Sequence, residues 1–361
     1  MKAIVYKEYG SAEVLRYTDV DKPAVGDDQV LVRVRAASIN YADRAIMHGS
    51  PSIMRLAFGL RRPKETILGR DIAGTVEAVG AKVTRFRVGD EVFGEMNQRG
   101  FAEYVAAPET HLAPKPAGVT FEQAATLPVA ATTALRALRL GEVGPGRTVL
   151  VNGASGGVGT FTVQLANALG AKVTGVCSTR NAELVRSIGA HHVIDYTRED
   201  LIPGTGRDTG RDVTRGTGRD VTRDTDRDTT QGAGHDVSRD AGRDAGRFDV
   251  IVDLAGNYRI SEFRRLLTPK GVYISSSGTG GPMLGPLPRL LAAAVISPFV
   301  SQKLRGLYVK RSTEDLTHLA ELVATGKITP VIQQTYPLGE TAAAIHSLET
   351  EHARGKVVLT L

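Results

Sequence analysis

The sequence predicts an α/β protein with two domains, a small β-rich domain and a doubly wound domain with a parallel sheet. Three observations lead to this fold class. The chain has 361 residues with 42% hydrophobic content, enough for two cores. Residues 148–180 read as strand, glycine turn, helix and strand, and short strands between Gly and Pro turns fill the first 120 residues.

The first domain is expected to span residues 1–120. Strand patterns at 29–36, 72–79 and 91–93 alternate with Gly and Pro turns, which predicts a small, irregular barrel. A helical pattern begins after Pro116, and the border is therefore placed near Thr120.

The second domain is expected to span residues 121–312. A helix over 121–140 leads into the glycine-turn unit, and further strands are predicted at 192–195, 248–254, 272–276 and 307–310. The last segment, 313–361, contains two helical patterns, 313–324 and about 341–348. It also holds strand patterns at 331–336 and 356–361, and we expect it to return to the first domain.

Residues 203–247 repeat Arg-Asp with Gly and Thr spacers and contain almost no apolar side chain. They cannot build a core, and equal numbers of Arg and Asp cancel in charge. We expect a disordered insertion between two strands, at a place where a short connection would suffice. It is either a neutral repeat expansion or a partner-binding or solubilising arm. Removing residues 204–246 should leave the core and its activity largely intact.

The glycine turn between the strand at 148–152 and the following helix predicts a dinucleotide site. A Cβ would block both the sharp turn and the approach of a pyrophosphate to the helix N-terminus. Ala154 departs from the usual G-x-G-x-x-G pattern, and the alternative is a structural turn without a ligand. The predicted cofactor-binding residues of this turn are Gly153, Ser155, Gly156, Gly157, Val158 and Gly159.

The end of the next strand indicates which dinucleotide binds. NAD sites usually carry Asp or Glu there, whereas this chain has Cys177, Ser178, Thr179 and Arg180. A hydroxyl and a guanidinium can bind a 2′-phosphate that a carboxylate would repel. Ser178 and Arg180 therefore predict NADP(H), unless Arg180 is only a solvated residue at a helix start.

Composition excludes several classes of protein. No 18-residue apolar run or signal-peptide pattern is present, so no stable membrane insertion is expected. A single cysteine fits a reducing cytoplasm, where we expect the protein to reside. The net charge of +6 comes without a basic stripe or any Trp, so nucleic acid is not an expected partner.

Several ordered motifs make the chain resemble the medium-chain dehydrogenase/reductase superfamily, in its zinc-free quinone oxidoreductase branch. The resemblance covers nearly all of the chain outside 203–247. It implies a GroES-like catalytic domain split across both chain ends, a Rossmann domain between them, and usually a homodimer. The motifs are ASINYAD at 37–43, LGRDIAG at 68–74, VGDEV at 88–92, AATLP at 124–128 continuing to Thr133-Ala134, the glycine turn, and ARGKVV at 353–358.

The same comparison predicts that no metal is bound. Zinc-bearing relatives have a cysteine in the first motif and a His-Glu pair in the second, where this chain has Asn40 and Arg70-Asp71. The eight histidines are scattered, and one cysteine cannot form a four-cysteine site.

Without a Lewis acid, the substrate must already be electrophilic, which favours quinones and α,β-unsaturated carbonyls. The resemblance places Asn40, Tyr41 and Asp43 on a turn facing the nicotinamide. We expect Tyr41 to donate to the developing oxyanion, Asn40 to position the reactants, and Asp43 to orient both. Alternatively, Asp43 only pairs with Arg70 or Arg44, and Tyr41 only packs.

The resemblance also brings Thr133 toward the nicotinamide and Tyr196 toward the 2′-phosphate; the alternative is that both are ordinary helix and strand residues. The loop 275–281 would bring Ser276 and Gly278 to the nicotinamide half, although it also fits a plain flexible loop. The apolar, proline-broken stretch 284–304 predicts a pair of short buried helices, or else a lid over an acyl-chain or isoprenoid quinone pocket.

The function predicted from these features is NADPH-dependent reduction of quinones or activated enones, acyl thioester enones included. The alternative is an NADPH-binding redox sensor or partner-binding protein with little turnover.

Overall fold

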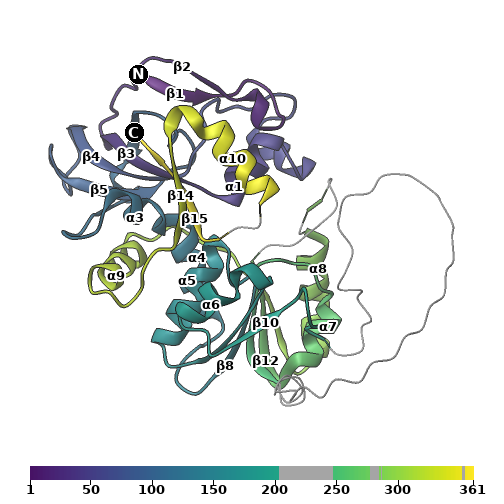
Figure 1. The fold of residues 1–361 in the computed structure, drawn as a ribbon. Coiled ribbons are helices and arrows are strands. Elements are labelled where there is room, and N and C mark those ends of the chain that lie inside the picture. The colour runs from purple at the N-terminus through teal and green to yellow at the C-terminus, as the bar shows by residue number, and fades with distance from the viewer. Residues whose placement is uncertain (203–246, 277–283, 286, 352–353) are drawn as a thin grey trace, which may run out of the picture.

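The structure is a computed structural model that describes residues 1–202, 247–276, 284–285, 287–351 and 354–361. Most of the Arg-Asp repeat, together with Gly278, therefore lies outside the described residues. The chain forms two domains, with both termini in the upper one (Figure 1). The lower domain holds the parallel sheet and its flanking helices.

The upper domain is built on a seven-stranded sheet in the order β14-β15-β3-β4-β5-β7, with β6 pairing with β3. A separate hairpin joins β1 and β2. The strands are β1 (Lys2–Val5), β2 (Arg16–Asp19), β3 (Gln29–Ile39), β4 (Asp71–Val79), β5 (Glu91–Glu95), β6 (Tyr104–Pro108), β7 (Leu112–Pro114), β14 (Ile332–Pro337) and β15 (Lys356–Thr360). The helices of this domain are η1 (Ala12–Val14), α1 (Tyr41–His48), η2 (Ser52–Met54), α2 (Arg55–Phe58), η3 (Glu109–His111), α9 (Thr313–Ala324), η7 (Leu338–Glu340) and α10 (Thr341–Thr350).

The C-terminal strand joins this sheet directly. β15 pairs antiparallel with β3, with Val357 opposite Ile39, and both residues are almost fully buried. Burial of apolar side chains on both strands stabilises this pairing between the two ends of the chain. Residue Lys356, which begins β15, consequently lies beside Asn40, the residue after β3.

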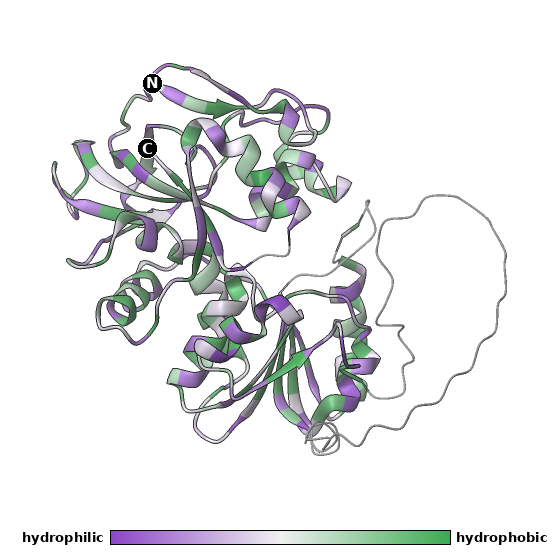
Figure 2. Ribbon diagram, in the orientation of Figure 1, coloured by the Kyte–Doolittle hydropathy of each residue, from purple (hydrophilic) through white to green (hydrophobic). Residues whose placement is uncertain are grey.

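The lower domain is a six-stranded parallel sheet in the order β10-β9-β8-β11-β12-β13. Its strands are largely hydrophobic along their centres, whereas the surrounding helices mix both kinds of residue (Figure 2). The strands are β8 (Thr148–Asn152), β9 (Lys172–Cys177), β10 (His192–Asp195), β11 (Phe248–Asp253), β12 (Leu267–Ser275) and β13 (Lys303–Gly306). The helices are η4 (Leu127–Ala131), α4 (Thr132–Leu140), α5 (Gly157–Ala168), η5 (Thr179–Asn181), α6 (Ala182–Ser187), α7 (Ile260–Leu266), α8 (Leu287–Ile296) and η6 (Ser297–Phe299). Helix α3 (Phe121–Ala125), which precedes η4, packs instead on β3 and β4 of the upper domain.

The helical pattern predicted for 121–140 is interrupted by a turn of π-helix, η4. The wider turn brings the Val129 backbone N–H within 3.3 Å of the buried Asp71 carboxylate in the upper domain. Such π-bulges often occur at functional sites.

Two predictions about the last strand and the apolar stretch are wrong. The strand is 303–306 rather than 307–310, because 303–306 pairs with β12 while Tyr308 is 87% exposed and has no neighbouring strand. The helices in 284–304 are not buried as a pair. Ala293 packs inward, but Leu291, Val295 and Phe299 are exposed.

The expected short connection before β11 is also wrong. β10 and β11 run parallel within one sheet, so the chain that leaves the carboxyl end of β10 must cross back before β11 begins. Such a crossover normally takes a dozen or more residues.

Among the described helices, none is long and apolar enough to cross a membrane.

Candidate active site

A cleft with a volume of about 650 Å³ lies where the carboxyl ends of β8, β9 and β11 meet α1, η4 and α4. Its volume is in the range of cofactor and ligand pockets, and the carboxyl edge of a parallel sheet is where such folds bind ligands. It is bordered by Asn40, Tyr41, Thr133, Gly153, Ser155, Gly156, Gly157, Val158, Gly159, Ser178, Tyr196 and Ser276. Of the residues predicted for the site, Asp43 and Arg180 do not border it, and Gly278 is outside the described residues.

The glycine turn forms the floor of this cleft. Gly153 has a φ of 90°, which favours glycine, and Gly156 precedes the first turn of α5. An added Cβ at Gly156 would meet only the Gly153 carbonyl oxygen, at 3.6 Å, so that side of the turn is open. The free N–H groups at the start of α5 suit a phosphate.

One end of the cleft carries polar groups that have no partner within the described residues. The hydroxyl of Ser178 is buried and makes no hydrogen bond there, and neither does the side-chain oxygen of Asn181. Asn181 also donates to the Ser155 hydroxyl at 3.1 Å. Buried polar atoms without partners are costly, so these positions are suited to a polar ligand.

Arg180 lies just outside this end of the cleft. Its side chain is 51% exposed, and the guanidinium is 4.0 Å from the Glu351 carboxylate. The structure therefore places Arg180 against an acid of the upper domain rather than on the wall of the cleft.

The opposite end of the cleft is formed by the turn from β3 into α1. Tyr41 is 69% exposed, borders the cleft, and has the Arg44 guanidinium 5.0 Å from its ring centre. Asp43 is fully buried and accepts the Asn40 backbone N–H at 2.8 Å, capping α1. Burial raises the pKa of Asp43 to about 6. Asp43 thus holds the turn in shape, and the ion pairs considered for it with Arg70 or Arg44 do not form.

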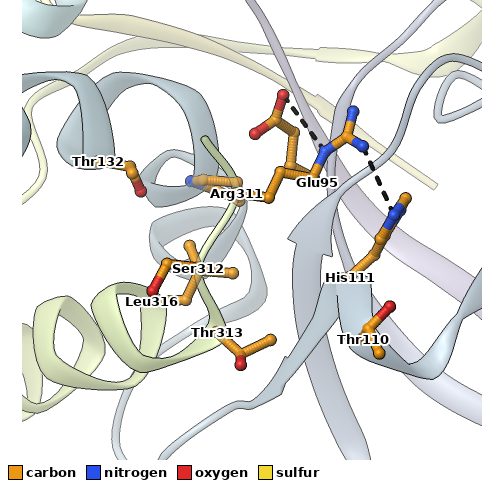
Figure 3. A pocket seen from close by; sticks show the side chains of 9 residues that line it. Glu95, Thr110, His111, Thr132, Arg311, Ser312, Thr313 and Leu316 are labelled. Carbon is orange, nitrogen blue, oxygen red and sulfur yellow. Dashed lines mark hydrogen bonds and ion pairs between the residues drawn. The ribbon is translucent and has the colours of Figure 1, made fainter. Parts of the chain in front are cut away.

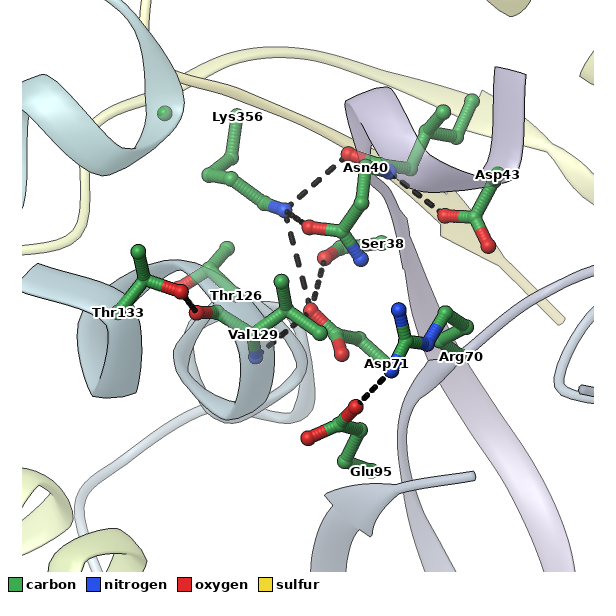
Figure 4. A network of polar contacts seen from close by, with 12 residues as sticks. Ser38, Asn40, Asp43, Arg70, Asp71, Glu95, Thr126, Val129, Thr133 and Lys356 are labelled. Atoms are coloured by element: carbon green, nitrogen blue, oxygen red, sulfur yellow. Dashed lines mark hydrogen bonds and ion pairs between the residues drawn. The ribbon is translucent and has the colours of Figure 1, made fainter. Parts of the chain in front are cut away.

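Behind Asn40 lies a buried polar network, shown in Figure 4. The Lys356 ammonium donates to the Asn40 side-chain oxygen at 2.6 Å and to the Ile39 carbonyl at 3.1 Å. It is also 3.8 Å from the Asp71 carboxylate. Burial raises the pKa of Asp71 to about 7 and lowers that of Lys356. From the sequence, Lys356 was placed in the closing motif and the last strand but was given no role in the site. A lysine directly before the apolar run of β15 was the available signal.

Arg70 and Glu95 extend this network away from the cleft, where they form an ion pair with each other. Figure 3 shows Arg311 between Glu95 and His111, with its guanidinium 3.7 Å and 3.5 Å from them. The space there is about 10 Å³, room for one water, so this is a packed joint and not a substrate site.

The nicotinamide-facing predictions have modest contacts. Thr133 borders the cleft, but its hydroxyl donates to the Val129 carbonyl at 2.6 Å. Ser276 borders the cleft directly after β12.

Two asparagines that were not predicted, Asn152 and Asn257, also border the cleft. Asn152 donates at 2.7 Å to buried Asp253, which also pairs with Arg289 of α8. A polar residue ending an apolar strand was the signal for Asn152.

The residues of the cleft fit a dinucleotide but the network does not fit a zinc ion. The open glycine turn and the unpartnered Ser178 hydroxyl suit a phosphorylated ligand. In contrast, the Asn40–Asp71 region is filled by the Lys356 ammonium and the Arg70 guanidinium, two cations that would repel a metal. Among the described residues, no three His, Cys, Asp or Glu side chains are grouped so that they could hold a metal ion.

Known proteins are similar to this chain in both sequence and architecture. A family described as "Alcohol dehydrogenase GroES-like domain" matches residues 26–117, and one described as "Zinc-binding dehydrogenase" matches residues 226–359. The NADPH-dependent alkenal/one oxidoreductase of Arabidopsis thaliana chloroplasts is 30% identical over 99% of this chain and 79% of its own length. The chain belongs to the medium-chain dehydrogenase/reductase superfamily, in its quinone oxidoreductase-like branch.

Further members of this superfamily agree. The chloroplastic quinone-oxidoreductase QR1 of Triphysaria versicolor is 30% identical over 99% of this chain and 98% of its own. The quinone oxidoreductase structure from Coxiella burnetii superposes with a TM-score of 0.78 at 27% identity, covering 100% of this chain and 99% of that one. The protein is thus an oxidoreductase with a GroES-like domain, a Rossmann domain and a nicotinamide cofactor.

Proposed function

We propose that this protein is a zinc-independent, NADPH-dependent reductase of quinones or α,β-unsaturated carbonyls. The observation that carries the proposal is the single cleft that joins the glycine turn to the Asn40-Tyr41 turn. Relatives named as quinone and alkenal/one oxidoreductases support the substrate class.

The preference for NADPH rests on Ser178, whose buried hydroxyl has no hydrogen-bond partner within the described residues. No acid follows β9 directly, where an NAD site would usually carry one. Arg180 is close enough in sequence to add positive charge at this end, although it is half exposed and shares that charge with Glu351.

The proposed chemistry needs orientation and a hydrogen bond more than acid-base catalysis. A bound nicotinamide supplies hydride to a conjugated carbon of the substrate. Tyr41, exposed at the cleft edge, is the proposed donor to the oxygen that gains negative charge, and Asn40 shapes the wall beside it. Thr133 and Ser276 would border the carboxamide side of the ring.

Independence from zinc is proposed from the chemistry of the groups around Asn40, where an ammonium and a guanidinium stand near Asp71. We also propose a homodimer and a cytoplasmic location. The homodimer is supported by β13, the last strand of the described sheet, and by exposed Leu291, Val295 and Phe299 beside it. Light scattering of the purified protein tests the dimer.

The decisive experiment is a spectrophotometric screen of NADPH oxidation across quinones, 2-alkenals, enones and simple ketones, in the presence and absence of EDTA. We expect turnover with the conjugated substrates, weaker turnover with simple ketones, and no effect of the chelator. A Tyr41→Phe variant should lose turnover and keep NADPH affinity. NADPH binding without turnover of any compound would reject the reductase in favour of a sensor or a binding protein.

A further inference from the structure

The buried side chain of Lys356 connects two parts of the site that belong to different domains. Its aliphatic stem lies on the glycine turn, because a Cβ added at Gly157 would come within 2.8 Å of the Lys356 Cδ. Its ammonium reaches the Asn40 turn, where it donates to the Asn40 side-chain oxygen and the Ile39 carbonyl. The side chain is only 3% exposed.

The backbone next to Lys356 strengthens this connection. The Gly355 N–H donates to the Ser155 carbonyl at 2.8 Å, and Gly355 pairs with Gly156 in an isolated parallel bridge. On its other side, the Lys356 N–H donates to the Val331 carbonyl at 2.8 Å. The start of β15 is therefore held on both sides, and the ammonium at the end of the side chain is held by its own hydrogen bonds to Asn40 and Ile39.

The charge arrangement explains why a cation is stable here. Removing an ammonium from water is costly unless it is paired and hydrogen-bonded. Asp71 supplies the opposite charge at 3.8 Å, and it is itself held by the Val129 N–H and the Ser38 hydroxyl. The ammonium also donates hydrogen bonds to two oxygens, the Asn40 side-chain oxygen and the Ile39 carbonyl.

We propose that Lys356 is a positioning residue that fixes the Asn40-Tyr41 turn at the reacting end of the cleft and links it to the glycine turn. Lys356 does not border the cleft, so it acts through Asn40 and not on the cofactor or substrate. This inference rests on the proposed reductase function for its kinetic readout. Amide exchange of the turn provides a second readout that does not depend on turnover.

The experiment compares Lys356→Met with the double variant Lys356→Met/Asp71→Asn, which removes the carboxylate that the single substitution leaves unpaired. Lys115→Met is the matched control. That lysine is 6% exposed and pairs with Glu91 at 2.8 Å, but it does not border the cleft. If the single variant is too unstable to purify, the double variant carries the test.

We expect the double variant to bind NADPH within about threefold of wild type and to lose about 100-fold in kcat, the scale expected when a reacting geometry is misplaced. Amides of residues 40–43 should exchange about tenfold faster, and Lys115→Met should change neither quantity. Wild-type kcat and exchange in the double variant would overturn the proposal. So would a large loss of NADPH affinity with normal kcat at saturating cofactor. If wild type itself turns over no substrate, the proposed function fails, and the exchange rates alone decide the role of Lys356.

Discussion

A methyl group added to either of two glycines of the same turn should have different effects: at Gly159 it should lower the stability of the protein, and at Gly156 it should lower the affinity for NADPH. A Cβ at Gly159 would lie 2.8 Å from both carbonyl atoms of Ala154, and closer still to the Gly153 oxygen. These are backbone atoms and cannot rotate away. A Cβ at Gly156 would have only an ordinary contact of 3.6 Å and would point into the cleft.

The magnitudes decide the expected outcome for Gly159→Ala. Overpacking against backbone costs about 1–3 kcal/mol or more, and helix propensity returns only about 1 kcal/mol inside α5. We expect net destabilisation of about 2 kcal/mol, a fall in Tm of about 5 °C. For Gly156→Ala the lost N-cap preference and the reduced entropy of the unfolded chain roughly cancel, so Tm should stay close to wild type.

NADPH affinity should respond to the substitution at Gly156, which leaves the stability of the protein nearly unchanged. Gly156→Ala should weaken NADPH at least about tenfold, or 1.4 kcal/mol, while the protein remains folded, because the methyl group occupies cofactor space. Differential scanning fluorimetry and NADPH titration by fluorescence measure both effects. A Gly159→Ala protein as stable as wild type, or a Gly156→Ala protein with normal NADPH affinity, would refute the geometry of this turn.

Four further predictions follow from other parts of the molecule. Arg180→Ala should weaken the binding of NADPH, but not of NADH, by about 1–2 kcal/mol, which is low for a charged hydrogen bond because the side chain is half exposed. Calorimetry measures both affinities, with Arg186→Ala, a substitution of another exposed arginine, as the control. Burial raises the pKa of Asp43 from 3.8 to about 6, so its contribution to stability is full below about pH 4 and is lost as the pH rises through 6. Urea unfolding should therefore show wild type losing stability relative to Asp43→Asn over that interval, and a constant difference would contradict the pKa. Elemental analysis of protein dialysed against EDTA should find no stoichiometric zinc with activity retained, whereas activity restored only by zinc would sink the metal-free proposal. Replacing residues 204–246 with a flexible linker of about 12 residues should preserve Tm and NADPH affinity, and a sharp fall in either would show that the repeat is part of the fold. Deleting these residues without a linker should prevent correct folding, because the crossover from β10 to β11 would be too short.

Features that depend on neighbours along the chain could be predicted from the amino-acid sequence. A tight turn beside a pyrophosphate needs residues without a Cβ, so Gly153 and Gly156 predict both the turn and its ligand from local pattern alone. Ser178 was predicted from the same unit, because the residue that directly follows β9 lies at the carboxyl edge of the sheet, where the cleft is. The short strand pattern at 192–195 likewise predicted β10 at its observed bounds, and the helical pattern at 313–324 predicted α9.

Contacts between residues that are distant along the chain could not be predicted in this way, because they depend on how the strands pair. Lys356, Asn40 and Asp71 lie on three separate strands or their ends, and their hydrogen bonds depend on β15 pairing with β3 and β3 pairing with β4. The position of Lys356 before an apolar strand marks it as unusual, but it does not predict a side chain that is only 3% exposed or the partners that it meets. Arg180 illustrates the same limit, because its side-chain direction depends on Glu351 of the other domain. Packing between segments sets the burial and charge of each side chain, so the chemistry of the reacting end of the cleft could be read only from the fold.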